Sequence, residues 1–297
     1  MKKYIFLLII IFLTGCSSYV ELNNLAIINI IGIEKINDDY KITISLIDKI
    51  DDDFEPTMET VNIIDSNLNL AFIKLTNLLD KKIYLSHLNV LVINNSIKTI
   101  ELKEIINFFL NNQESREDFL VTFSNNINDV LEKSNFQEIN NLLKINYKET
   151  SEVIYMTMYD LIKNYYDNNS FYLTNIDYKD NIYIKGIISF KNNNYEELNN
   201  KEAIFINYLL NDIQSYNYTY KCDNNKYLNL KIINATSNTI KKDLMLTNEI
   251  NIISNDCNLN KENINNNLIK YLKDNISKYT NKKITIKNTI RGNYENK

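Results

Sequence analysis

The chain of 297 residues has few of the residues on which most catalytic and cofactor-binding motifs depend. It contains 4 Gly, 1 Pro, 1 His and no Trp. The glycines, Gly15, Gly32, Gly186 and Gly292, lie far apart, which excludes a Walker loop, a dinucleotide-binding fingerprint and a G-x-S-x-G nucleophile elbow. With His87 as the one histidine, histidine-based metal sites are excluded as well. We therefore predict a protein that is not an enzyme, needs no cofactor and holds no metal.

The overall composition is that of a folded globular protein. Hydrophobic residues make up 44% of the chain and charged residues 24%, and the length suffices for one large or two ordinary domains. Charge is unevenly distributed, since residues 16–180 contain 14 Lys and Arg against 26 Asp and Glu, whereas residues 181–297 contain 17 against 11. The asymmetry indicates two domains with different surroundings, although plain solvated surface explains it equally well.

The first sixteen residues have the three parts of a bacterial lipoprotein signal. Lys2 and Lys3 form a short positive region, and the apolar run over residues 4–13 is shorter than the ~20 residues that a membrane-spanning helix needs. The run leads into a lipobox composed of Leu13, Thr14, Gly15 and Cys16. Two small residues let a signal peptidase reach the bond before Cys16, whose thiol would accept a diacylglyceryl lipid. We expect the mature chain to begin at Cys16, outside the cytoplasm, rather than an uncleaved membrane helix or a buried strand.

Two cysteines, Cys222 and Cys257, remain after Cys16. An even pair outside the cytoplasm can form a disulfide. Two cysteines this far apart in sequence seldom meet by default, because a disulfide needs Cα atoms within about 7 Å of each other. We therefore favour two free thiols.

Hydrophobic periodicity predicts alternating strands and helices in the first part of the chain. Asn37, Asp38 and Asp39 indicate a hairpin turn, and Ser66 is a candidate helix cap. The acidic loop at residues 51–53 lacks the spacing and glycine of an EF-hand, so we expect a solvated loop there rather than a calcium site. The expected strands span residues 25–33, 40–47, 58–64, 88–93 and 119–123, and the expected helices span 68–79, 101–110, 127–132, 138–146 and 153–166.

A polar turn near residues 177–181 separates this region from the next. There the expected strands span residues 183–190, 227–233, 244–253 and 283–290, and the expected helices span 201–213 and 264–276. Helices interspersed with antiparallel strands predict an α+β fold of more than one domain, with mixed sheets flanked by helices behind the signal peptide.

An ordered series of short stretches resembles the spore germination lipoproteins, which are the C subunits of germinant receptors (the Ger(x)C family). The series covers roughly residues 13–210, and its most similar stretch is IYLSHLNVLVI at residues 83–93. The chain departs from the family pattern at Ser17 and Ser18, where Trp-Asp is usual, at Ser86, and at Asn112 and Gln113. Its C-terminal part is also shorter. The other matching stretches are ELNNLA at 21–26, GIE at 32–34, INFFL at 106–110 followed by Glu114 and Arg116, DVLE at 129–132 and GIISFK at 186–191.

The resemblance implies a lipid-anchored, non-enzymatic subunit of a spore nutrient germinant receptor, on the outer face of the spore inner membrane. It implies A- and B-type membrane subunits as partners, and neither nucleic-acid binding nor direct small-molecule binding is expected. The expected domains are a signal peptide at residues 1–15, an N-terminal germination-lipoprotein domain at 16–180 and a shortened C-terminal domain at 181–297. The rival interpretations are a solute-binding lipoprotein of an importer and a surface hydrolase that uses carboxylate chemistry.

Five residues are candidates for structural or partner contacts: Glu21, Leu22, His87, Arg116 and Gly186. A lone histidine before a buried strand most often has a structural role, with a ligand or switch role as the alternative. Arg116, two residues after Glu114, is expected to form a surface or turn-pinning ion pair with it, or else to contact a partner.

Overall fold

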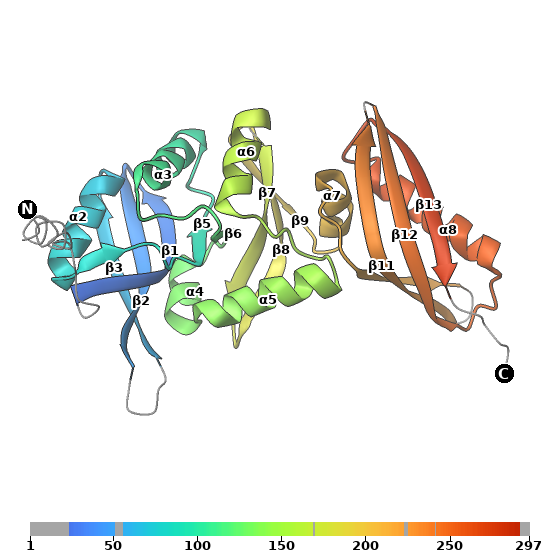
Figure 1. The fold of residues 1–297 in the computed structure, drawn as a ribbon, viewed down its shortest axis with the longest axis horizontal. Helices are drawn as coiled ribbons and strands as arrows, with labels where there is room; N and C mark the ends of the chain where they lie inside the picture. The colour runs from blue at the N-terminus through green and yellow to red at the C-terminus, as the bar shows by residue number, and fades with distance from the viewer. Residues whose placement is uncertain (1–23, 51–55, 169, 223–224, 241, 292–297) are drawn as a thin grey trace, which may run out of the picture.

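The structure is a computed structural model that describes residues 24–291, apart from residues 51–55, 169, 223–224 and 241. It contains a nine-stranded mixed sheet and a four-stranded mixed sheet, with helices packed on both (Figure 1). The predicted α+β class is confirmed. The lipobox with Cys16, the candidates Glu21 and Leu22, and the acidic loop at 51–53 lie outside the described residues.

The large sheet has the strand order β3-β2-β1-β5-β6-β7-β8-β9, with β4 pairing with β1. An antiparallel meander, β3-β2-β1, is joined by the parallel strands β5, β6 and β7, and the antiparallel strands β8 and β9 complete the far edge. The bounds are β1 Leu25–Ile36, β2 Asp39–Ile50, β3 Pro56–Asp65, β4 Lys82–Tyr84, β5 Val90–Ile93, β6 Leu120–Phe123, β7 Ser170–Tyr178, β8 Ile182–Lys191 and β9 Asn194–Leu198.

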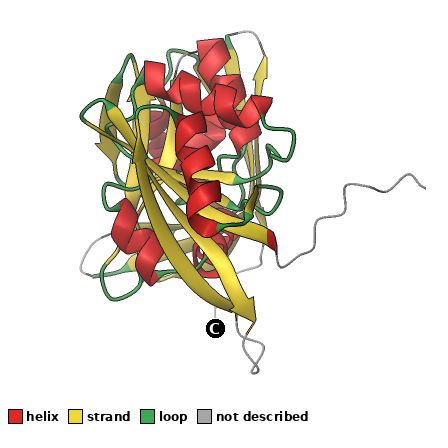
Figure 2. Cartoon of the chain, turned by 90° about the vertical axis from the view of Figure 1, so that its left-hand side faces the viewer, coloured by secondary structure: helices red, strands yellow, loops and turns green. Residues whose placement is uncertain are grey.

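Both faces of the central strands are buried, which is why β1 and β5 have nearly continuous apolar sequences. In β5, Leu91 and Ile93 join one core while Val90 and Val92 join another on the opposite face. The first face carries α2 (Leu68–Leu79), α3 (Thr99–Asn111) and α6 (Met158–Asn168), and the second carries α4 (Ile127–Lys133) and α5 (Phe136–Glu149). Figure 2, viewed from the end that carries β2 and β3, shows helices on both sides of the strands.

The small sheet has the order β10-β11-β12-β13, and α8 packs on one of its faces. In β13 the exposed residues Lys283, Lys287 and Arg291 alternate with half-buried isoleucines that contact this core. The helix α7 lies between the two sheets (Figure 1). The bounds are α7 Glu202–Leu210, β10 Tyr216–Lys221, β11 Tyr227–Ile240, β12 Asp243–Asn255, α8 Lys261–Ile276 and β13 Lys283–Arg291.

The helix predicted over residues 153–166 begins only at Met158. The preceding segment is extended and lies between β6 and β7, which pair at a single position. Val121 N donates to Met156 O at 2.8 Å on the β6 side, and Ile154 N donates to the Thr174 hydroxyl at 2.9 Å on the β7 side. Hydrogen bonds to distant strands thus replace those of a helical turn.

Smaller differences from the predictions have local causes. Asn67, rather than Ser66, caps α2, because its side chain accepts from the backbone N–H groups of Asn69 and Leu70. Leu78 has the spacing of the buried residues Leu68, Ala71 and Leu75 of α2, but it is 61% exposed. The strands β7, β9 and β10, which are rich in Asn and Tyr, were not predicted.

The large sheet continues past residue 180. The boundary expected there falls in the turn of the β7–β8 hairpin, whose strands pair from Tyr178 with Ile182 to Ser170 with Lys191. The change from the large sheet to the small one comes after β9, which ends at Leu198. We therefore propose Leu198 as a later point at which to divide the chain.

The preference for free thiols was wrong: Cys222 and Cys257 form a disulfide with their Cα atoms 6.1 Å apart. Cys222 directly follows β10, and Cys257 lies in the turn after β12. Pairing of Leu228 in β11 with Asn255 in β12 brings these two ends together. Sheet register, which sequence spacing does not reveal, therefore places the thiols side by side.

Candidate functional site

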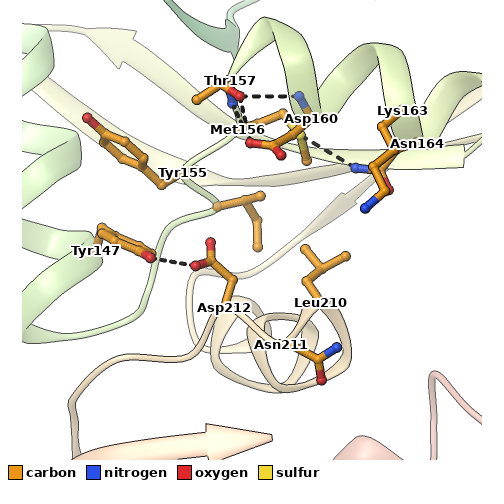
Figure 3. Close-up of a pocket in the computed structure, with 11 residues that line it drawn as sticks. Tyr147, Tyr155, Met156, Thr157, Asp160, Lys163, Asn164, Leu210, Asn211 and Asp212 are labelled. Carbon is orange, nitrogen blue, oxygen red and sulfur yellow. Dashed lines mark hydrogen bonds between the residues drawn. The ribbon is translucent and has the colours of Figure 1, made fainter. Parts of the chain in front are cut away.

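A cleft of about 410 Å³ opens where α5, the extended segment before α6, and the end of α7 meet. We call it the junction cleft, and Figure 3 shows its lining side chains. Its volume is within the usual range for small-molecule sites, and domain junctions are common places for such sites. It is lined by Tyr147, Ile154, Tyr155, Met156, Thr157, Asp160, Lys163, Asn164, Leu210, Asn211 and Asp212.

The sharp turn after α7 positions Asp212 at this cleft. Asn211 ends the helix in the left-handed conformation, at φ 59°, and Asp212 N then donates to Asn207 O at 2.9 Å. The buried Asn207 side chain holds α7 against the extended segment, because its Nδ2 donates to Ser151 O at 3.1 Å and to Val153 O at 2.9 Å. The α7 turn and the extended segment are therefore fixed relative to each other.

Two carboxylates face the junction cleft. Burial raises the pKa of Asp212, and the negative charge of Asp160 raises it further, while the hydrogen bond from Tyr147 acts in the opposite direction. Asp160 belongs to the start of α6, where its Oδ2 accepts from the Thr157 hydroxyl at 2.6 Å. Among the described residues, no lysine or arginine pairs with either carboxylate, although Lys163 also lines the cleft.

Two tyrosines form the wall beside Asp212. The rings of Tyr147 and Tyr155 stack with their centroids 5.0 Å apart. The Tyr147 hydroxyl donates to Asp212 and accepts from Gln214 Nε2 at 2.8 Å. Burial is the main cause that raises the pKa of both tyrosines, so both hydroxyls stay neutral at ordinary pH.

A second, smaller hollow of about 160 Å³ brings together two of the predicted site residues, His87 and Arg116. We call it the His87 hollow. Asp118 and Asn140 also line it, and Tyr155 separates it from the junction cleft. Its lining is polar, and its charged residues Arg116 and Asp118 already pair with each other. It therefore has fewer free groups than the junction cleft with which to bind a ligand.

The ion pair expected between Arg116 and Glu114 does not form. Arg116 pairs instead with Asp118, and Glu114 pairs with Lys82 from β4. Both pairs are on the surface and contribute little to stability. His87 packs its ring beside Tyr84, at 5.7 Å between ring centroids, and its carbonyl accepts from Asn89 Nδ2 at 2.7 Å.

Gly186 lies apart from both hollows, where β8 approaches β9. A Cβ atom at this position would overlap the carbonyl oxygen of Leu198. Position 186 therefore needs glycine because the backbones of β8 and β9 pack closely there.

Within the described ranges, no group of three or more His, Cys, Asp or Glu side chains could hold a metal ion. No helix among the residues that the structure describes is both long and apolar enough to cross a membrane.

Sequence reasoning did not identify Tyr147, Tyr155, Asp160 or Asp212 as site residues. One signal for Asp160 was present, because Thr157 and Asp160 have the spacing of a capping box, which locates the start of α6. Nothing local connects Asp212 with Tyr147, which is 65 positions earlier.

Comparison with known proteins gives one family and one structure. Residues 18–178 match the family described as "Spore germination protein N-terminal domain". A solved structure described as the crystal structure of the GerBC protein is similar at 16% identity and a TM-score of 0.48, over 84% of this chain and 79% of that chain. No curated protein matches the chain.

Proposed function

Because the chain belongs to the Ger(x)C family of spore germination proteins, whose N-terminal domain matches more than half of it, we propose that it is a lipid-anchored, non-enzymatic subunit of a nutrient germinant receptor. Family membership supports the role of a receptor subunit, and the match over residues 18–178 is the observation that carries it. We propose that the protein supports receptor assembly and relays the germination signal.

The anchor is proposed from the sequence around Cys16. A diacylglyceryl group on this thiol supplies two acyl chains, and two chains hold a protein on a membrane stably whereas one binds only marginally. The disulfide between Cys222 and Cys257 supports a position outside the cytoplasm, since disulfides persist in oxidising compartments. We place the protein on the outer face of the spore inner membrane.

The partners proposed are the A- and B-type membrane subunits of the receptor. The molecule is elongated, with β2 and β3 at one end of its longest axis and the small sheet at the other (Figure 1). Such a shape offers separate surfaces at its two ends and along its length, which suits a subunit that joins others together.

Replacing Cys16 with Ala tests the proposal. The variant lacks the thiol that accepts lipid, so we expect unprocessed precursor, less assembled receptor and slow or absent germination with the nutrients that this receptor serves. The measurements are loss of optical density by spores and a blot of membrane fractions. Ser18→Ala is the matched control, because it changes a residue close to Cys16 and leaves the Cys16 thiol in place.

Germination by agents that bypass nutrient receptors should be unchanged in the Cys16→Ala spores. Equal loss of both responses would contradict the proposal, because it would indicate a general spore defect. Deletion of the whole gene with every nutrient response intact would contradict it too.

A further inference from the structure

The junction cleft contains two acidic side chains, Asp160 and Asp212, that form no salt bridge among the described residues. A charged group taken out of water is normally paired with an opposite charge or becomes neutral. Asp160 and Asp212 face the same cleft, Lys163 is the one basic residue of its lining, and no salt bridge joins Lys163 to either carboxylate. The lining therefore carries net negative charge, and Asp212 is partly desolvated.

The remaining lining suits a cation that carries a short apolar body. Tyr147 and Tyr155 supply aromatic surface next to Asp212, and aromatic faces attract cations. Ile154, Met156 and Leu210 supply apolar contacts. Figure 3 shows Asp212 and Tyr147 on one side of the cleft, with Asp160 and Thr157 on the other.

We propose that the junction cleft binds a small organic ammonium ion, whose charged nitrogen lies between the Asp160 and Asp212 carboxylates while its hydrocarbon part contacts the tyrosines. This site goes beyond the receptor-subunit role and depends on neither the lipid anchor nor partner subunits. It also revises the expectation that small molecules do not bind directly, since no cleft could be recognised from the sequence.

The position of the cleft gives the bound ion a structural consequence. Tyr147 and Asp160 belong to helices on the large sheet, whereas Asp212 follows α7, the helix that leads into the small sheet. An ammonium ion between Asp160 and Asp212 joins these two parts. The bound ion would thus add a contact between two parts that the Asn207 hydrogen bonds already hold together.

The test uses the full chain purified in a non-ionic detergent, with n-butylammonium chloride as the probe. Neutral n-butanol and anionic sodium butyrate serve as comparison probes, and binding is measured by saturation-transfer NMR with empty micelles as background. We expect n-butylammonium to bind with a dissociation constant on the order of 1 mM and the two comparison probes to bind at least about tenfold more weakly.

Asp212→Asn and Asp160→Asn should each weaken n-butylammonium binding about tenfold. Both keep an oxygen that can accept the existing hydrogen bond, from Tyr147 or Thr157 respectively, and circular dichroism checks that each variant is folded. Asp118→Asn is the matched control, because Asp118 lines the His87 hollow instead, and its binding should equal that of the unchanged protein.

A pH series adds a second readout. The titratable groups facing Asp212 are Tyr147, Tyr155, Asp160 and Lys163, and burial keeps both tyrosine hydroxyls neutral. Burial raises the pKa of Asp212, so lowering the pH neutralises it early and n-butylammonium affinity should fall from pH 7 towards about pH 4. The proposal is overturned if n-butylammonium binds the protein no more strongly than it binds empty micelles, or if the three probes bind with equal affinity. It is also overturned if both cleft variants bind n-butylammonium as the unchanged protein does, or if the affinity does not depend on pH.

Discussion

Cys222 and Cys257 connect two turns at one end of the small sheet and are 35 positions apart in the chain. A crosslink over this separation restricts the unfolded chain, and the chain-entropy account gives about 3–4 kcal/mol of stabilisation. The disulfide lies next to the paired residues Leu228 in β11 and Asn255 in β12. It therefore stabilises a strand pairing that the sheet forms through its own hydrogen bonds.

Replacing both cysteines with Ser should lower the free energy of unfolding by about 3 kcal/mol, as measured by urea denaturation followed by circular dichroism. The Ser variant and the reference protein should both carry Cys16→Ser, so that Cys222 and Cys257 are the only cysteines of the reference protein. In the reference protein, an alkylating reagent should label neither cysteine until reductant is added. Full labelling without reductant, together with unchanged stability, would show that the disulfide does not form.

Glycine has a specific packing role at two positions. A Cβ atom at Gly32 in β1 would overlap the side chain of Ile127 in α4, and one at Gly186 would overlap the backbone of Leu198. The sequence placed both glycines within strands and left their roles open. Their neighbours, 95 and 12 positions away, became apparent only when the sheet and its covering helix were assembled.

At the scale of elements, α7 is apolar on nearly all sides because it contacts two cores. Ala203 and Ile206 pack in the core of the large sheet, while Phe205 and Tyr208 pack in that of the small sheet. A helix that is hydrophobic all round is expected to be buried, and here the two sheets bury it together. The helix therefore couples the two parts of the molecule through its opposite faces.

Tyr208 begins a chain of buried and partly buried hydrogen bonds that crosses the small sheet. Its hydroxyl donates to Asn248 in β12 and lies 3.0 Å from that of Tyr216. Asn248 Nδ2 donates to Asn288 in β13 at 2.8 Å, and Asn288 Nδ2 donates to Asn265 in α8 at 2.9 Å. These bonds link α7 to α8 through the sheet.

Tyr208→Phe should lower the free energy of unfolding by about 1–3 kcal/mol, because it removes a donor to the buried oxygen of Asn248. Urea denaturation gives this quantity. Tyr227→Phe is the control, since Tyr227 is an exposed residue of β11, and it should change stability by less than about 0.5 kcal/mol. Equal effects of the two substitutions would mean that the chain of hydrogen bonds does not stabilise the small sheet.

At the scale of the whole molecule, the place where the sheets change determines which fragment can fold. A fragment that starts at residue 181 begins inside the β7–β8 hairpin and leaves β8 without its partner β7. A fragment of residues 199–297 keeps α7, the small sheet, α8 and the disulfide together. It also keeps an excess of basic residues, 15 Lys and Arg against 9 Asp and Glu.

We predict that residues 199–297 fold alone and bind anionic vesicles. Lys283 and Lys287 point outward from β13, and a basic residue near an anionic leaflet gains up to about 1 kcal/mol. Circular dichroism establishes folding, and co-sedimentation with vesicles of anionic and of neutral lipid, at low and high salt, measures binding. The expected result is binding to anionic vesicles that weakens as salt rises.

Equal sedimentation with neutral vesicles would contradict the membrane interpretation of the charge asymmetry. No sedimentation with either kind would contradict it as well, and would leave an acidic partner surface as the alternative. A variant with Lys283→Gln and Lys287→Gln provides the matched control and should sediment less with the anionic vesicles.

The sequence by itself determined most of the regular elements and the α+β class. The apolar run over residues 25–33 predicted the strand β1, the spacing of Leu68, Ala71, Phe72 and Leu75 predicted α2, and alternation over residues 227–233 and 244–253 predicted strands within β11 and β12. Each of these signals is local, because the period of a helix or strand sets which neighbouring side chains share a face. Other local stretches, such as residues 83–93 and 186–191, carried the resemblance to the germination family.

Only the tertiary structure decided the form of the segment before α6, the pairing of Cys222 with Cys257, the ion-pair partner of Arg116 and the existence of the junction cleft. The segment before α6 has a sequence that suits a helix, but β6 and β7 offered its backbone hydrogen bonds to distant residues instead. Asp212 and Tyr147 likewise meet because α7 packs against the segment that follows α5. Such contacts depend on how separate elements pack against one another, and the periodicity of a single element contains no information about its distant neighbours.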